Sequence, residues 1–336
     1  MTRHFVVASL GSIGQRHLRN LRILRPDARI TALRRPESAP VTCDGCDGEV
    51  TSVEAALALR PDGVILAGPA PTHVRLARAF VEQGIPVFIE KPLSHDIIGL
   101  DELAAVAARG AIPVMVGYNL RFNPSLNALR QDLLGGAIGK VLAVRAEVGQ
   151  YLPDWRSNAD YRQGVSARRA LGGGPILELS HEIDYLYWLF GMPAWVTCRG
   201  GRYSDLEMDV EDCVDICLEY AEPRRLVSVH LDFLQRPVAR TCKFIGSGGT
   251  IVWEALRDRH IVEAMDGGRR VVESPLPDRN RMYLDELTDF LGAIEDGWPV
   301  SIPLSDGIDV MRIISAAARS LTIGRSISLL EVEPYA

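Results

Sequence analysis

The first 120 residues alternate short apolar runs with segments of helical periodicity, and this alternation constrains the fold more than any other feature. Each apolar run predicts a buried strand, and the segments between them carry leucine and alanine at helical spacing. The runs are residues 5–8, 30–33, 64–67, 87–90 and 113–116. Repeated strand–helix units predict a parallel sheet with right-handed crossovers, as in α/β domains.

After Tyr118 the pattern changes to a helix, a strand, a long loop, another helix and several β-like runs. Helices are expected over 124–134, 176–190, 282–295 and 307–322, and strands over 141–148, 195–199, 214–220, 226–233 and 241–245. The short turns between the later runs predict an open, mostly antiparallel sheet. We expect two domains, residues 1–120 and 121–336, with the last helices as candidates to pack back on the first.

The chain has 336 residues and a formal net charge of −6, which argues against a general nucleic-acid binder. No apolar run approaches the roughly 20 residues that a membrane span needs, and no signal peptide precedes Gly11. We therefore expect a cytoplasmic protein that binds neither membranes nor nucleic acid. Cys43 and Cys46 form the one tight pair among six cysteines, so we expect reduced thiols and no metal site.

The turn between the first strand and the first helix contains Ser9, Gly11 and Gly14. It fits the dinucleotide-binding fingerprint except that Ser9 stands where the first glycine is expected. Gly11 would let the backbone approach a pyrophosphate, and Gly14 would let helix and strand pack closely. The helix N-terminus at Ser12 and Ile13 would then supply N–H groups to the anion. The alternative is an ordinary strand-to-helix turn.

Residues at the end of the second strand select the cofactor in such folds, because they meet the adenosine ribose. An acid there binds the 2′-hydroxyl, whereas arginine accommodates a 2′-phosphate. This chain has Arg34 and Arg35, with no acid before Glu37. The pair favours NADP slightly over NAD. The alternative is that Arg34 stacks on adenine and NAD also binds.

Glu90, Lys91 and Pro92 directly follow the fourth predicted strand. Lys91 therefore projects from the carboxyl end of a parallel strand, where open α/β sheets bind ligands. Burying an ammonium group without a partner is expensive, so packing alone does not explain a lysine there. We expect Lys91 to face a ligand, and a solvated loop lysine is the alternative.

A glycine run at 172–174 precedes a predicted helix that carries Glu178, His181 and Asp184. The spacing i, i+3 and i+6 places these three side chains on roughly one helix face. A carboxylate beside a histidine fixes its tautomer and tunes its pKa, which suits a general acid or base. The alternatives are a solvated polar stripe or a hydrogen-bonded core histidine.

The predicted loop over 151–174 mixes aromatic and charged residues without clear periodicity, and long loops inside compact domains are usually functional. Tyr151, Trp155, Arg156 and Tyr161 are its candidate substrate contacts. Aromatic faces suit sugar rings, and arginine suits phosphate or carboxylate, so the loop favours an anionic sugar such as a nucleotide sugar or a sugar acid. A solvated charged loop with one packed tryptophan is the alternative.

These motifs together resemble the Gfo/Idh/MocA oxidoreductases over nearly the whole chain. The motifs are the glycine turn, the Glu90-Lys91-Pro92 triplet, the glycine run with its His-x-x-Asp, the segment 188–191, Pro71-Thr72-His73, the segment 118–122 and the segment 246–250. The resemblance implies an N-terminal Rossmann domain and a C-terminal α/β domain whose open sheet forms homodimer or homotetramer contacts. It also implies NAD(P)-dependent oxidation or reduction of a sugar, sugar nucleotide or cyclitol.

The resemblance assigns roles to individual residues. Lys91 and His181 would flank the substrate as catalytic residues. Pro71, His73 and Glu90 would join the cofactor site, and Tyr118, Asn119 and Arg121 would join the substrate site.

The chain departs from the family pattern at Ser9 and at Leu177, where many members have an aspartate four residues before the histidine. Glu178 or Asp184 would then be the acidic member of the site. The segment before His181 looks one residue shorter than that pattern. In this shortened form it resembles a subgroup of the family found in bacterial surface-sugar and amino-sugar pathways.

Two other functions remain open on this fold, because a fold does not determine function. An enzyme with tightly held cofactor would oxidise its substrate transiently to enable epimerisation, elimination or glycoside cleavage. A cofactor-bound regulator would show no turnover, although such a protein need not retain both Lys91 and His181.

Overall fold

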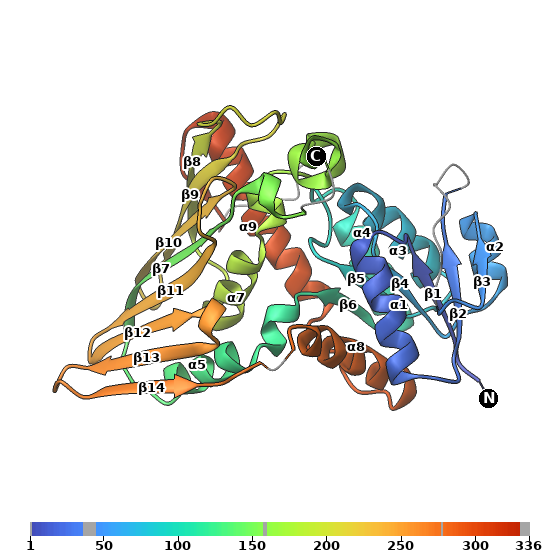
Figure 1. The fold of residues 1–336 in the computed structure, drawn as a ribbon, viewed down its shortest axis with the longest axis horizontal. Helices are drawn as coiled ribbons and strands as arrows, with labels where there is room; N and C mark the ends of the chain where they lie inside the picture. The colour runs from blue at the N-terminus through green and yellow to red at the C-terminus, as the bar shows by residue number, and fades with distance from the viewer. Residues whose placement is uncertain (1, 36–44, 157–159, 277, 330–336) are drawn as a thin grey trace. The chain divides into compact units, whose positions relative to one another are not determined.

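The computed structural model describes residues 2–35, 45–156, 160–276 and 278–329. The polypeptide divides into two compact units (Figure 1). The first comprises Met1–Asn119 and Arg279–Ile308, and the second comprises Leu120–Asp278 and Asp309–Ala336. A segment from near the C-terminus therefore completes the first unit.

The first unit contains a six-stranded parallel sheet in the order β3-β2-β1-β4-β5-β6. Its strands are β1 (His4–Ala8), β2 (Arg29–Leu33), β3 (Gly48–Val50), β4 (Gly63–Leu66), β5 (Val87–Glu90) and β6 (Val114–Gly117). This is the strand order of doubly wound dinucleotide-binding folds, in which the order reverses between β1 and β4. Ligands bind outside the carboxyl ends of the strands at that reversal.

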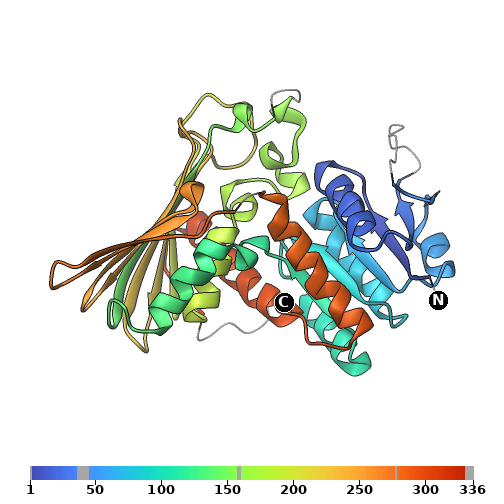
Figure 2. The same cartoon turned by 60° about the horizontal axis from the view of Figure 1, so that its bottom comes forward.

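Helices pack on this sheet because its central strands are buried along their length. They are α1 (Ser12–Leu24), α2 (Val53–Ala58), α3 (His73–Val81), α4 (Leu100–Gly110) and α8 (Asn280–Glu295). Figures 1 and 2 show α8 beside α1, and the two helices are in contact.

The second unit contains a nine-stranded mixed sheet in the order β14-β13-β12-β11-β7-β10-β9-β8-β15. The strands are β7 (Val141–Gly149), β8 (Trp195–Gly201), β9 (Cys213–Tyr220), β10 (Arg225–Asp232), β11 (Ala239–Gly246), β12 (Gly249–Glu254), β13 (Arg259–Ala264), β14 (Arg269–Glu273) and β15 (Ile327–Ser328). The β7–β10 pair is parallel and the other pairs are antiparallel. The prediction of a mostly antiparallel second sheet is confirmed.

Alternation along the strands gives this sheet one buried face. In β9 the side chains of Val214, Ile216 and Leu218 are buried, whereas those between them are more exposed. The helices α5 (Pro124–Leu134) and α7 (His181–Phe190) contact the sheet. Leu226 on β10 is half exposed and lies on the opposite face from Val227. The last helix along the chain is α9 (Leu304–Ile323), which comes after α8 in the sequence.

The predicted continuous helix over 176–190 is wrong. The structure has a short helix α6 (Pro175–Glu178) and a separate α7 that begins at His181. Leu179, with φ −100° and ψ 25°, leaves helical geometry between them. Glu178 and His181 therefore do not share one regular helix face, and the spacing argument that grouped them fails at this break.

The strands β3, β12, β13, β14 and β15 were not predicted. The strand β3 has three residues and β14 has mainly exposed side chains, so neither shows the apolar run that periodicity detects. The expectation of reduced thiols is wrong for Cys46, which is disulfide-bonded, whereas Cys198, Cys213, Cys217 and Cys242 are free. Cys43 lies outside the described residues. In the part of the chain that the structure describes, no helix is both long and apolar enough to cross a bilayer.

Candidate active site

The turn from β1 into α1 brings backbone atoms unusually close together. Ser9 has a φ of +75°, a conformation that glycine adopts readily and that strains other residues. A Cβ on Gly14 would lie 2.0 Å from the carbonyl oxygen of Ser9, so only glycine fits there. The conformation at Ser9 explains why a glycine is expected at that position, and the serine adopts it with some strain.

The N-terminus of α1 is open around Gly11. A Cβ on Gly11 would meet no atom within 4 Å, and no side chain caps the helix. Ser12 and Ile13 begin this 13-residue helix, and its first turn contains no acidic residue. No carboxylate of that turn therefore competes for the first N–H groups. An anion is stabilised in such a place by the N–H groups and the helix dipole.

Arg34 at the end of β2 is buried and is paired with an acid. Its Nη1 donates to Glu49 Oε2 at 3.0 Å, and Glu49 lies on the neighbouring strand β3. Arg35 is exposed. The sequence identified both arginines but not Glu49, because β3 was not predicted.

Glu90, the last residue of β5, has a buried carboxylate with two donors. His17 on α1 donates from Nε2 to Glu90 Oε1 at 2.6 Å, because a carboxylate can only accept there. The backbone N–H of Lys91 donates to Glu90 Oε2 at 3.0 Å. Lys91 itself is half-buried and follows the strand directly. Glu90 therefore fixes the backbone from which the Lys91 side chain departs.

His73 links the turn after β4 to the turn after β5. Its Nε2 lies 2.9 Å from the carbonyl oxygen of Gly68, and its Nδ1 lies 3.0 Å from that of Pro92. Burial lowers the pKa of His73 below its ordinary value, although the carbonyl contacts oppose this shift. Pro71 lies in the preceding turn, Ala70–Thr72. The geometry gives His73 a role in holding the Lys91 turn.

In the second unit, α7 is anchored by a buried ion pair. The Arg121 guanidinium donates from Nη2 to Asp184 Oδ1 at 2.7 Å and from Nε to both carboxylate oxygens. Both side chains are almost fully buried. Asp184 therefore orients Arg121 as well as the helix that begins at His181, which is itself half-buried.

Glu178 is oriented by the loop that precedes it. The Ser166 hydroxyl donates to Glu178 Oε2 at 2.6 Å. The glycine run between them is required by close contacts, because a Cβ on Gly173 would lie 2.4 Å from the carbonyl oxygen of Val165. Gly174 has a φ of +100°. The glycine run thus lets the loop and α6 come into close contact.

The candidate substrate residues lie in different environments. Trp155 is half-buried, donates to the carbonyl oxygen of Gln150 and packs edge-on against Phe233 with ring centroids 5.2 Å apart. Arg156 is exposed. The hydroxyl of Tyr161 accepts from the N–H of Glu207. The remaining candidates are placed as follows: Tyr151 contacts the Arg236 guanidinium, and Tyr118 and Asn119 are buried.

Sequence reasoning missed the charged residues that support these sites. His17 lies on the buried face of α1, four residues before Leu21, and that spacing was a usable signal. Glu286 on α8 lies four residues from Met282 and from Phe290, so it is an acid within an apolar stripe. Buried ionisable residues at such positions are candidates for functional sites.

Two family models match most of the chain. Residues 3–118 match an oxidoreductase family with an NAD-binding Rossmann fold, and residues 126–252 match the GFO/IDH/MocA C-terminal domain. The first match contains the glycine turn and Lys91, and the second contains His181 and Asp184.

The chain is also similar to several dehydrogenases. The inositol 2-dehydrogenase of Rhizobium meliloti is 26% identical over 98% of this chain and 100% of its own length. The myo-inositol 2-dehydrogenase of Thermotoga maritima is 25% identical over 81% of this chain and 80% of its own. A levoglucosan dehydrogenase solved with NADH and levoglucosan has the same fold, with a TM-score of 0.86, 20% identity and coverage of 98% and 100%. The chain belongs to the Gfo/Idh/MocA family of oxidoreductases.

Proposed function

We propose that the protein transfers a hydride between nicotinamide and a carbinol carbon of a cyclic polyol, either a cyclitol or a sugar. Lys91 hydrogen-bonds the reacting oxygen and stabilises negative charge on it. His181 takes or gives the hydroxyl proton. The cofactor supplies the hydride chemistry, and these residues supply orientation and proton transfer.

The observation that carries this proposal is the placement of Lys91. It follows β5 at the carboxyl edge of the parallel sheet, and Glu90 holds its backbone N–H. The same sheet carries the open N-terminus of α1 at the strand-order reversal. That edge is where doubly wound folds bind dinucleotides, so a lysine there is suited to act beside a bound cofactor.

Lys91→Met tests the role directly. We expect turnover to fall by roughly 10²–10⁴-fold, because a positioned donor to the reacting oxygen is lost. The dissociation constant for NAD should change less than about threefold, since the phosphate-binding turn is untouched. Turnover is followed by absorbance of the reduced cofactor. Lys140→Met, at an exposed lysine, is the matched control. Near-normal turnover in Lys91→Met would refute the role.

We propose a cyclic polyol because two of the relatives with the largest coverage are inositol dehydrogenases. An anionic substituent, as in a sugar acid or nucleotide sugar, would meet Arg156, which is exposed in the loop. A screen of inositols, neutral sugars, sugar acids and nucleotide sugars separates these classes. If Arg156→Ala changes KM for no anionic substrate, Arg156 has no such role. Membership of the surface-sugar subgroup stays a prediction.

We propose that NAD binds at least as tightly as NADP, which revises the preference drawn from Arg34 and Arg35. The Glu49 carboxylate already pairs with Arg34 and would repel a 2′-phosphate. Glu49→Gln should tighten NADP binding about three- to tenfold and leave NAD binding unchanged. This is the change in dissociation constant expected when one half-exposed repulsive charge is removed. Fluorescence titration of the two cofactors measures this. An equal effect on both cofactors would contradict the proposal, and Glu54→Gln on α2 is the control.

Transient oxidation remains the second candidate function. It predicts substrate turnover without net formation of reduced cofactor, whereas a dehydrogenase forms reduced cofactor in proportion to product. Product analysis and absorbance in the same reaction distinguish the two.

A further inference from the structure

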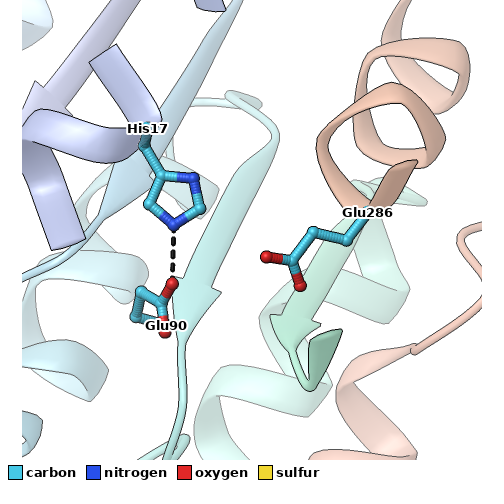
Figure 3. A group of neighbouring side chains, drawn as sticks. All are labelled: His17, Glu90 and Glu286. Atoms are coloured by element: carbon cyan, nitrogen blue, oxygen red, sulfur yellow. Dashed lines mark hydrogen bonds and ion pairs between the residues drawn. The ribbon is translucent and has the colours of Figure 1, made fainter. Parts of the chain in front are cut away.

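Three ionisable side chains meet inside the first unit from three different elements. Figure 3 shows His17 of α1, Glu90 of β5 and Glu286 of α8 pointing toward one another. Each offers a nitrogen or oxygen atom, and these atoms lie within 4.8 Å of one another. His17 and Glu286 are fully buried and Glu90 is 6% exposed. The cluster therefore lies in a medium where uncompensated charge is strongly disfavoured.

The two carboxyl groups differ in their hydrogen bonds. Glu90 accepts from the His17 ring and from the Lys91 N–H. Both oxygens of Glu286 are buried and have no hydrogen-bond partner among the residues that the structure describes. Hydrogen bonds to a carboxylate favour its charged form, and burial without them favours the neutral acid. Glu286 is therefore the carboxyl group of the two for which the described residues offer no hydrogen bond that favours the charged form.

We propose that Glu286 carries a proton in the folded protein and acts as a positioning residue for Lys91. A neutral Glu286 leaves Glu90 as the one charged carboxylate of the three residues, held by His17 and by the Lys91 N–H. Ionisation of Glu286 would place a second negative charge beside Glu90 and disturb that arrangement. The assignment of Lys91 as the affected residue rests on the proposed function, but the protonation of Glu286 does not.

The surroundings of Glu286 agree with a neutral acid. Burial raises the pKa of Glu286 well above its ordinary value, and the charge of Glu90 raises it further. The Arg16 guanidinium opposes this shift, but it stacks on the Tyr283 ring, 4.3 Å from the ring centroid. The charged and titratable groups around Glu286 are thus Arg16 and His17 on α1, Glu90 on β5 and Tyr283 on α8 itself.

A divalent cation is the other way to compensate two buried carboxylates, since one histidine and two carboxylates are suitable ligands. The His17–Glu90 distance of 2.6 Å is that of a strong hydrogen bond. A hydrogen bond requires a proton between the two atoms, whereas metal coordination requires both lone pairs to face the ion. The geometry therefore favours proton compensation.

The test compares wild type with Glu286→Gln by urea unfolding from about pH 6 to about pH 9. A raised folded-state pKa means that stability is lost as pH rises above the unfolded value of about 4.3. The unfolding constant of wild type relative to Glu286→Gln should therefore rise by up to about tenfold per pH unit until Glu286 ionises. Asp285→Asn, at the half-buried preceding residue, should follow wild type.

Turnover and metal content complete the test. The ratio of kcat in Glu286→Gln to that in wild type should rise with pH while KM and NAD affinity stay constant. A ratio that stays constant at pH values where the unfolding curves show Glu286 to be ionised would refute the positioning role. A stability difference that is independent of pH, or that favours wild type at alkaline pH, would refute the protonated state. One equivalent of divalent metal in the purified protein, lost in Glu286→Gln, would also overturn it. The unfolding measurement remains valid even if Lys91→Met shows normal turnover.

Discussion

Glu90 and Asp184 are both buried carboxylates close in sequence to a proposed catalytic residue, yet the two units compensate their charge differently. Asp184 pairs with the guanidinium of Arg121, and its neighbour Glu182 pairs with Arg240 at 2.9 Å. Glu90 contacts the imidazole of His17 at 2.6 Å. The Glu90 carboxylate accepts hydrogen bonds from the His17 ring and from the backbone N–H of Lys91.

The difference has a consequence for pH. Arginine stays charged at every accessible pH. The Arg121 partner of Asp184 therefore does not lose its charge as the pH changes. The proposed proton on Glu286 would make the stability contributed by the cluster around Glu90 change with pH. On the proposal for Glu286, the buried acids of the Rossmann unit respond to protons near neutral pH, whereas the Asp184–Arg121 pair of the second unit does not.

Breaking the fixed pair should give the largest effect. Arg121→Met leaves the Asp184 carboxylate buried without its guanidinium, and breaking a buried pair costs about 3–5 kcal/mol. Urea unfolding should show this loss, and the double variant Arg121→Met with Asp184→Leu should recover much of it because both charges are gone. A loss of less than about 1 kcal/mol in the single variant would show that the pair is not a charge anchor.

A partly exposed pair in the second unit should give a smaller effect and the opposite pH dependence to Glu286. Burial raises the pKa of Asp132, but hydrogen bonds from Arg270 and His260 outweigh it and lower the pKa overall. Asp132→Asn should cost about 1 kcal/mol at neutral pH after solvent screening. A lowered folded-state pKa gives stability that is present above about pH 4 and is lost as the pH falls.

The deficit of Asp132→Asn should therefore shrink in acid, whereas the advantage of Glu286→Gln should grow in alkali. Unfolding midpoints across the pH range measure both trends. Arg162→Ala, which removes exposed ion pairs with Asp160 and Glu207, is the control and should leave the midpoint unchanged. If the Asp132→Asn deficit stays constant down to strongly acidic pH, the depressed pKa is wrong.

The sequence predicted the parts of the site that depend on neighbouring residues. Gly14 and Lys91 were identified because each has a local signature, a strand followed by a glycine turn or by a charged residue. The same local logic failed at Leu179, where a helical pattern continued across a break in the backbone. Periodicity reports which side chains are apolar, and it does not detect a change in backbone direction between two helices.

The partners of the key carboxylates were decided by tertiary structure. His17 is 73 positions from Glu90, and Arg121 is 63 positions from Asp184. Glu49, which pairs with Arg34, lies on a three-residue strand without a sequence signal of its own. The sequence by itself determined the alternation of strands and helices along the first unit, the glycine turn and the exit of Lys91 from its strand, because these follow from local periodicity and sterics. Only the folded chain decided which charge each buried acid meets, because sheet order and helix packing bring distant residues together.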